Sequence, residues 1–255
     1  MSNQSCIYWF SGTGNSLYAA KHLSAELGDI PLEQITQAVP SGAVGGKGTN
    51  IGFVFPSYGC NLPRAVRTFV ERLEISPDTY IFAIVTMGGP GQGTVAAMKK
   101  ALKEKGLNLN YGRGVHMPAN YVLLYNPADS SGSGKTLDKT DQRLSTYAAD
   151  ISADLQTVKS HPFIMNKFYK NIEALDAGFK TMDACTSCGQ CERICPVKNI
   201  QIEDGKPKWL HHCEHCVACI SWCPSKAIEY ESRTQSRRRY RNPRIKVDEL
   251  IPCKK

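Results

Sequence analysis

Residues 185–196 read CTSCGQCERICP, and residues 213–224 read CEHCVACISWCP. Each stretch has three cysteines separated by two residues, a fourth after three more residues, and then proline. The second stretch begins 28 residues after the first. Apolar and polar residues alternate after both, in residues 199–204 and 227–231. A duplicated half-domain is the simplest explanation of this repeat.

The repeat holds eight of the eleven cysteines, and only Cys6, Cys60 and Cys253 lie outside it. Such clustering favours metal binding over a disulfide framework. Three cysteines at this spacing can meet three iron corners of one cubane cluster. Two pairs of cysteines could instead hold zinc, but the third cysteine of each unit would then be superfluous. The repeat therefore predicts two [4Fe-4S] clusters, with zinc as the weaker alternative.

The fourth cysteine of each unit begins the turn away from its own loop, so we expect it to bind the other cluster. The predicted ligands of one cluster are Cys185, Cys188, Cys191 and Cys223, and those of the other are Cys213, Cys216, Cys219 and Cys195. His211, His212 and His215 are expected near the second unit without ligating. Residues 184–229 resemble the two-cluster bacterial ferredoxins, which implies a compact domain that passes one electron at a time.

A second motif is Ser-Gly-Thr-Gly-Asn-Ser at residues 11–16, between an apolar run and a helical pattern. Glycine permits close approach of the backbone, and helix N-terminal amides with neighbouring hydroxyls can hold a phosphate. The motif contains no Lys or Arg. It therefore suits a buried monophosphate held by neutral donors; the alternative is a tight turn between a strand and a helix.

Apolar runs alternate with helical patterns through the first 160 residues. We expect strands at residues 5–10, 51–55, 80–87 and 109–116, and helices at 17–27, 62–73, 94–105 and 144–158. Residues 126–139 are rich in Ser and Gly and are expected to form a loop. The alternation predicts an α/β fold with a parallel sheet covered on both faces.

The opening strand, loop and helix resemble the FMN-phosphate loop of flavodoxins. The resemblance implies FMN contacts from three groups of residues: Ser11, Thr13, Gly14, Asn15 and Ser16 with the phosphate, and Pro56, Ser57, Tyr58 and Gly59, then Thr86, Met87, Gly88 and Gly89, with the ring. Residues 117–121 are similar to a segment of flavodoxin–ferredoxin fusion proteins, which adds Asn120 or Tyr121. Tyr58 and Tyr121 could also be ordinary, partly exposed tyrosines.

The whole chain resembles this fusion family. That implies a flavodoxin-like doubly wound parallel sheet of order 2-1-3-4-5, with FMN at the carboxyl ends of the strands, followed by a small α+β ferredoxin-type domain. We predict a flavodoxin-like domain at 1–160, a connector at 161–183, the two-cluster domain at 184–230 and a basic tail at 231–255. The tail's run of Arg237, Arg238 and Arg239 is either solvated or docks an acidic redox partner.

The net charge of +8 would alone favour a partner such as nucleic acid. Cofactors change that balance, because eight thiolates, two cubane cores and an FMN phosphate would bring the loaded protein to roughly +2. We therefore expect a redox partner protein and no nucleic acid. No apolar run of membrane-spanning length and no signal-type N-terminus is present, so we expect a cytoplasmic protein without a membrane span.

FMN exchanges one or two electrons and each cluster exchanges one. The first hypothesis is therefore an electron-transfer protein that passes electrons between FMN and its clusters. The second is an FMN-dependent reductase of a small molecule fed by those clusters. The third, a basic zinc protein that binds nucleic acid, would be colourless. The sequence does not decide between a carrier and an enzyme.

Overall fold

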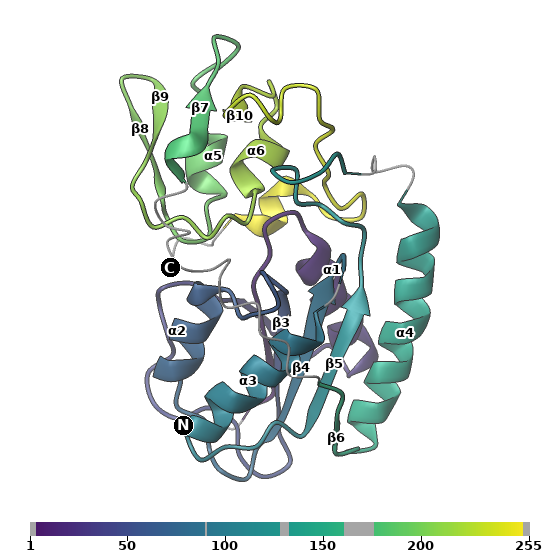
Figure 1. Cartoon of the computed structure of the whole chain (residues 1–255). Helices are drawn as coiled ribbons and strands as arrows, with labels where there is room; N and C mark the ends of the chain where they lie inside the picture. Colours follow the sequence, from purple (N-terminus) through teal and green to yellow (C-terminus); the bar gives the residue numbers. More distant parts are fainter. Residues whose placement is uncertain (1–3, 90, 128–132, 161–175, 252–255) are drawn as a thin grey trace.

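A parallel sheet of six strands forms the first part of the chain (Figure 1). In this computed structural model the described residues are 4–89, 91–127, 133–160 and 176–251. The strands run in the spatial order β2-β1-β3-β4-β5-β6, and every neighbouring pair is parallel. Their bounds are β1 Cys6–Trp9, β2 Leu32–Gln34, β3 Asn50–Pro56, β4 Tyr80–Met87, β5 Tyr111–His116 and β6 Thr157–Val158. The predicted order 2-1-3-4-5 of a doubly wound, flavodoxin-like sheet is confirmed, with β6 added at one edge.

Helices cover both faces of this sheet (Figure 1). They are α1 Asn15–Glu26, α2 Arg64–Arg72, α3 Gln92–Glu104 and α4 Gly134–Ser152. The pairs α1 with α4 and α2 with α3 lie in contact, one pair on each face. The central strands β3 and β4 are buried along almost their whole length, which explains their continuous apolar sequence.

Two sequence expectations at the edges of this part were wrong. Residues 134–139 begin α4 instead of ending a loop, because Leu137 and Thr140 are buried and fix the first turns of the helix. The helix ends at Ser152, where Asp154 takes a positive φ of 51°, and Val158 lies in β6. The short strand β2 was not predicted, since all three of its residues are only half-buried.

The second part sits on the carboxyl edge of the sheet (Figure 1). It contains two antiparallel pairs, β7 with β10 and β8 with β9, and two short helices. The bounds are β7 Phe179–Thr181, α5 Gln190–Arg193, β8 Ile200–Glu203, β9 Lys206–Trp209, α6 Ala218–Trp222 and β10 Ile228–Tyr230. This is the predicted small α+β ferredoxin-type domain behind the flavodoxin-like sheet.

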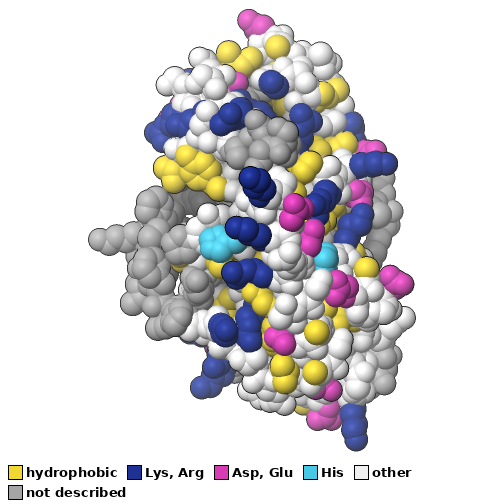
Figure 2. Space-filling view, turned by 90° about the vertical axis from the view of Figure 1, so that its right-hand side faces the viewer, with side chains coloured by type: hydrophobic (Ala, Val, Ile, Leu, Met, Phe, Trp, Pro, Cys, Tyr) yellow, Lys and Arg dark blue, Asp and Glu magenta, His cyan; other side chains and the backbone are white. Residues whose placement is uncertain are grey.

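The C-terminal segment, residues 231–251, packs against both parts. Tyr240, Asn242 and Leu250 are almost fully buried, and a 3-10 helix, η2, spans Val247–Leu250. Arg244 pairs with Asp138 and Asp141 of α4. Figure 2 shows basic and acidic side chains lying side by side on one face of the molecule. The segment is therefore folded against the rest of the protein and does not form a free tail.

The basic run within this segment is bonded to the protein. Arg237 donates to the Val122 oxygen, and Arg238 donates to the Pro127 oxygen. Arg239 forms an ion pair with Glu229 at 2.7 Å, and both side chains are buried. The expectation of a solvated run is therefore wrong for Arg239. Cys253 and residues 161–175 of the predicted connector lie outside the described residues.

Candidate functional site

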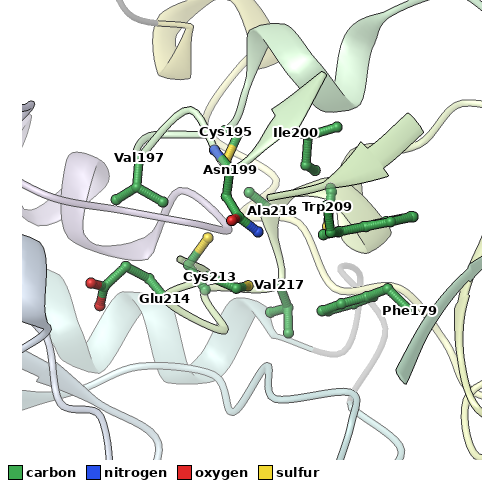
Figure 3. A pocket seen from close by; sticks show the side chains of 12 residues that line it. Phe179, Cys195, Val197, Asn199, Ile200, Trp209, Cys213, Glu214, Val217 and Ala218 are labelled. Carbon is green, nitrogen blue, oxygen red and sulfur yellow. The ribbon is translucent and has the colours of Figure 1, made fainter. Parts of the chain in front are cut away.

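The eight cysteines of the repeat line two cavities in the second part. One is lined by Cys195, Cys213, Cys216 and Cys219, and the other by Cys185, Cys188, Cys191 and Cys223. These are the two crossed sets expected from the spacing. Figure 3 shows the sulfurs of Cys195 and Cys213 in the first cavity, with the stacked rings of Trp209 and Phe179 beside them.

The backbone of the two units follows the same path. Left-handed φ values recur at matching positions, at Ser187 and His215, Gly189 and Val217, and Lys198 and Lys226. Such angles cost a β-branched residue free energy, so Val217 is held there by the loop around it. Matching N–H···S bonds also occur, from Asn199 to the Cys195 sulfur and from Ala227 to the Cys223 sulfur. The two cysteine units thus share one loop conformation, as expected for a duplicated half-domain.

The two cavities differ in exposure. In the first, Cys195, Cys213 and Cys219 are buried, and burial raises the pKa of the Cys213 thiol to about 12. In the second, Cys188 is exposed, while burial raises the pKa of Cys191 to about 11. Free thiols with raised pKa values stay protonated at neutral pH, so metal binding would have to displace those protons. The donor set of four sulfurs in each cavity fits a cubane cluster.

Glu214 fastens the first cavity to the sheet domain. Its two carboxylate oxygens accept from the backbone N–H groups of Arg64 and Ala65, both at 3.0 Å, at the start of α2. Arg64 also donates to the Cys213 oxygen. In Figure 3 the Glu214 carboxylate points away from the two labelled sulfurs. Burial raises the pKa of Glu214, while Arg64 and the two amides favour its charged form.

The three histidines lie around the first cavity with protein partners. His211 contacts the buried Asp176 carboxylate at 2.7 Å, and His212 contacts the Val197 oxygen at 3.0 Å. The Nδ1 of His215 lies 3.3 Å from the Tyr121 hydroxyl, and burial lowers the pKa of His215 to about 4. That these three histidines do not ligate a metal stays a prediction.

The loop at residues 11–16 lies directly beneath the first cavity. Gly12 approaches the Cys216 backbone so closely that a Cβ would lie 2.1 Å from its oxygen. Trp222 of α6 donates through Nε1 to the Gly12 oxygen at 3.1 Å. The cavity and the loop therefore share one interface at the carboxyl edge of the sheet.

Several acceptors of this loop are occupied by donors of the protein. Ser11 Oγ accepts from the Gly14 N–H at 3.1 Å, and Thr13 Oγ1 accepts from Asn120 at 2.6 Å. The Thr13 oxygen accepts from the Asn242 N–H, and Asn15 Oδ1 accepts from Tyr240 and Asn242. In the part of the chain that the structure describes, the donors left over are the hydroxyl protons of Ser11 and Thr13 and backbone N–H groups other than that of Gly14. A set of neutral donors fits a phosphate, as the FMN interpretation requires.

The remaining predicted flavin residues take varied positions. Thr86 contacts Ser16 at 2.7 Å through the two hydroxyls, and Ser57 contacts Thr94 in the same way. Gly88 packs tightly on Ala119, while Gly89 has open space around it. Tyr58 is half-buried, and its ring and the Phe10 ring form a T-shaped pair with centroids 6.5 Å apart. The structure brings Ser11, Thr13, Asn15, Ser16, Thr86 and Asn120 together, and places Tyr121 beside His215 instead.

Sequence reasoning missed four residues that build this interface: Glu214, Trp222, Tyr240 and Asn242. The first two stand between cysteines of the repeat, whose spacing indicates the metal ligands and not the residues between them. The other two lie in a polar segment without periodicity. No local pattern could connect Tyr240 to Asn15, which lies 225 positions earlier in the chain.

The fold and the cavities define a doubly wound α/β domain that carries a small α+β domain with two cysteine-lined cavities on its carboxyl edge. Residues 181–240 match the family model of the 4Fe-4S dicluster domain. This match covers less than half of the chain, so it identifies the iron–sulfur domain alone. None of the curated proteins matches the chain. No described helix has the length and apolar composition needed to cross a membrane.

Several solved structures are similar to part of the chain. A candidate flavoprotein from Bacteroides uniformis is 17% identical, with 46% of this chain and 92% of that chain covered at a TM-score of 0.34. One from Bacteroides eggerthii is 22% identical, with 44% and 87% covered at 0.34. The Trp repressor binding protein from Bacillus subtilis is 10% identical, with 58% and 96% covered at 0.38. At such low TM-scores the fold of this chain rests on its own strand order.

Proposed function

We propose that the protein transfers electrons through two [4Fe-4S] clusters and an FMN bound at the carboxyl edge of its sheet. The single observation that carries the proposal is the pair of cavities, each lined by four cysteines taken from both units of the repeat. The match of residues 181–240 to a 4Fe-4S dicluster domain supports the clusters. The loop at residues 11–16, in which Ser11 Oγ, Thr13 Oγ1 and Asn15 Oδ1 already accept hydrogen bonds from the protein, supports the FMN phosphate.

The protein's own residues would hold these groups in fixed positions. Cys195, Cys213, Cys216 and Cys219 would bind one cluster in the buried cavity, and Cys185, Cys188, Cys191 and Cys223 the other. Ser11, Thr13 and the backbone of the loop would bind the phosphate. When bound, the clusters supply one-electron exchange and the flavin supplies one- or two-electron exchange. Glu214 holds the buried cavity at the start of α2, and Trp222 bonds to the loop at residues 11–16, so that the two sites lie close enough to favour exchange.

The proposed partner is a redox protein that meets the exposed cavity. Cys188 is exposed and Cys185 and Cys191 are half-buried, whereas three cysteines of the other cavity are buried. Electron exchange needs close approach of the two redox groups, so a partner reaches the cluster of Cys188 more readily. The buried cluster then connects this outer cluster with the loop.

Metal and flavin analysis of anaerobically purified protein tests the proposal. We expect about eight iron and eight sulfide per chain, as two cubanes require, and release of FMN on denaturation. An anaerobic reduction series with reduced ferredoxin, NADH and NADPH should then bleach both chromophores with at least one donor. Stoichiometric zinc without sulfide would contradict the clusters, and protein with full iron but no bound flavin would contradict the FMN site.

A further inference from the structure

The loop at residues 11–16 is covered by two segments far away in the sequence. Trp222 comes from α6 of the iron–sulfur domain, and Tyr240 and Asn242 come from the C-terminal segment. All three side chains are almost fully buried. This cover, formed by Trp222, Tyr240 and Asn242, also fits tightly at Gly14, where φ is +98° and a Cβ would lie 3.0 Å from the Asn242 Cβ.

The bonds from this cover to the loop all run in one direction. Trp222 Nε1 donates to the Gly12 oxygen at 3.1 Å, and the Asn242 N–H donates to the Thr13 oxygen at 2.9 Å. Asn15 Oδ1 accepts from the Tyr240 hydroxyl at 2.8 Å and from Asn242 Nδ2 at 3.0 Å. The cover therefore donates four hydrogen bonds to the loop. Among residues 4–89, 91–127, 133–160 and 176–251, it accepts no bond from the loop's N–H groups.

This one-sided pattern matters for an anion. A phosphate accepts hydrogen bonds and is repelled by carbonyl oxygens that point toward it. A short loop with two glycines could turn either its oxygens or its N–H groups toward a ligand, because glycine adopts both conformations readily. Occupying the Gly12, Thr13 and Asn15 oxygens from the cover leaves the N–H groups and hydroxyl protons as the donors available to a ligand.

We propose that Trp222, Tyr240 and Asn242 are positioning residues that hold the loop in its phosphate-binding conformation. The inference rests on the proposed FMN site and adds that the affinity of this site is set by the C-terminal segment and the iron–sulfur domain. We expect the phosphate group of FMN to be the part of the ligand that depends on the cover, since the four hydrogen bonds described above all end on the loop at residues 11–16.

Flavin titration of the full, anaerobically purified chain after removal of bound flavin tests this inference. Tyr240→Phe removes one hydroxyl, and we expect it to weaken FMN binding about five- to tenfold, as the loss of one buried hydrogen bond does. Riboflavin lacks the phosphate, and its dissociation constant should stay the same. Tyr80→Phe is the matched control, because it removes a hydroxyl bonded to the Leu155 oxygen at the opposite end of the sheet.

Asn242→Ala removes a side chain that bonds to the same Asn15 oxygen, and it provides a second variant if Tyr240→Phe does not fold. Iron content and melting temperature report folding of each variant without reference to flavin. Unchanged FMN affinity in both variants, or an equal loss for FMN and riboflavin, would overturn the inference. If the unaltered chain binds no FMN, the proposed site itself fails, and the inference with it.

Discussion

Gly12 and Cys216 meet backbone to backbone, so that a Cβ on Gly12 would lie 2.1 Å from the Cys216 oxygen and 2.9 Å from its carbonyl carbon. Backbone atoms on a ligand loop cannot move aside as the end of a flexible side chain can. Gly12→Ala should therefore displace the cysteine loop of the buried cavity. We expect a loss of about 1–3 kcal/mol in the free energy of unfolding, the usual cost of overpacking, together with lower iron content.

Gly134→Ala is the control for this prediction. Gly134 opens α4, and nothing lies within 4 Å of the position of its Cβ. Alanine should be tolerated there and can stabilise the helix slightly. Equal melting temperatures and iron contents for the two variants would show that the Gly12 contact does not constrain the cluster loop.

The proposed crossed ligand sets can be tested with pairs of serine variants. Cys195 and Cys213 line one cavity, and Cys188 lines the other. The double variant Cys195→Ser/Cys213→Ser should lose one cluster and keep about four iron per chain. Cys195→Ser/Cys188→Ser should lose both clusters, although it also replaces only two cysteines.

Cys60→Ser serves as the control, since Cys60 lies in the loop between β3 and α2 and lines neither cavity. It should keep about eight iron. The opposite pattern, with iron retained in the pair Cys195/Cys188 and lost in the pair Cys195/Cys213, would assign Cys195 to the cluster of its own unit.

Glu214 should contribute to stability through the start of α2. It accepts from two backbone N–H groups there, as an N-terminal capping side chain does. Glu214→Ala leaves those groups without this partner, and we expect a loss of about 1–3 kcal/mol in thermal or denaturant unfolding. Glu71→Ala on the exposed side of the same helix should have little effect. A Glu214 variant as stable as the Glu71 variant would show that the Glu214 carboxylate does not stabilise this interface.

The sequence was informative where a local pattern carried the information. The apolar run at Tyr80–Met87 gave the bounds of β4 correctly, and the cysteine spacing placed each set of four around one cavity. The sequence did not predict the elements whose formation depends on tertiary contacts. Residues Leu32–Gln34 form a strand only because β1 lies beside them, and Leu137 gives α4 its first buried contact among charged neighbours.

Removal of the clusters should unfold the second part of the chain as one unit. Its cavities are lined by cysteines from both halves, so each cluster would connect the two halves. After anaerobic chelation, hydrogen exchange should rise together in β8 and β10, while β3 and β4 stay protected within the apolar core of the sheet. Protection that persists in one of the two small sheets would show that the halves fold independently.

The ion pair between Arg239 and Glu229 should have a structural role that a surface pair does not have. Both side chains are buried, with 4% and 8% of their surface exposed, so Arg239→Ala would leave a carboxylate buried without its counter-ion. Breaking such a pair costs about 3–5 kcal/mol. Arg233 and Glu231 form a pair with 58% and 42% exposed in the same segment, and Arg233→Ala should cost less than about 1 kcal/mol. Denaturant unfolding of the two variants measures the difference. If Arg239→Ala destabilises the protein as little as Arg233→Ala does but slows electron transfer to a redox partner, the basic run is a docking surface. A large loss of stability would instead make Arg239 a structural part of the C-terminal segment that packs over the carboxyl edge of the sheet.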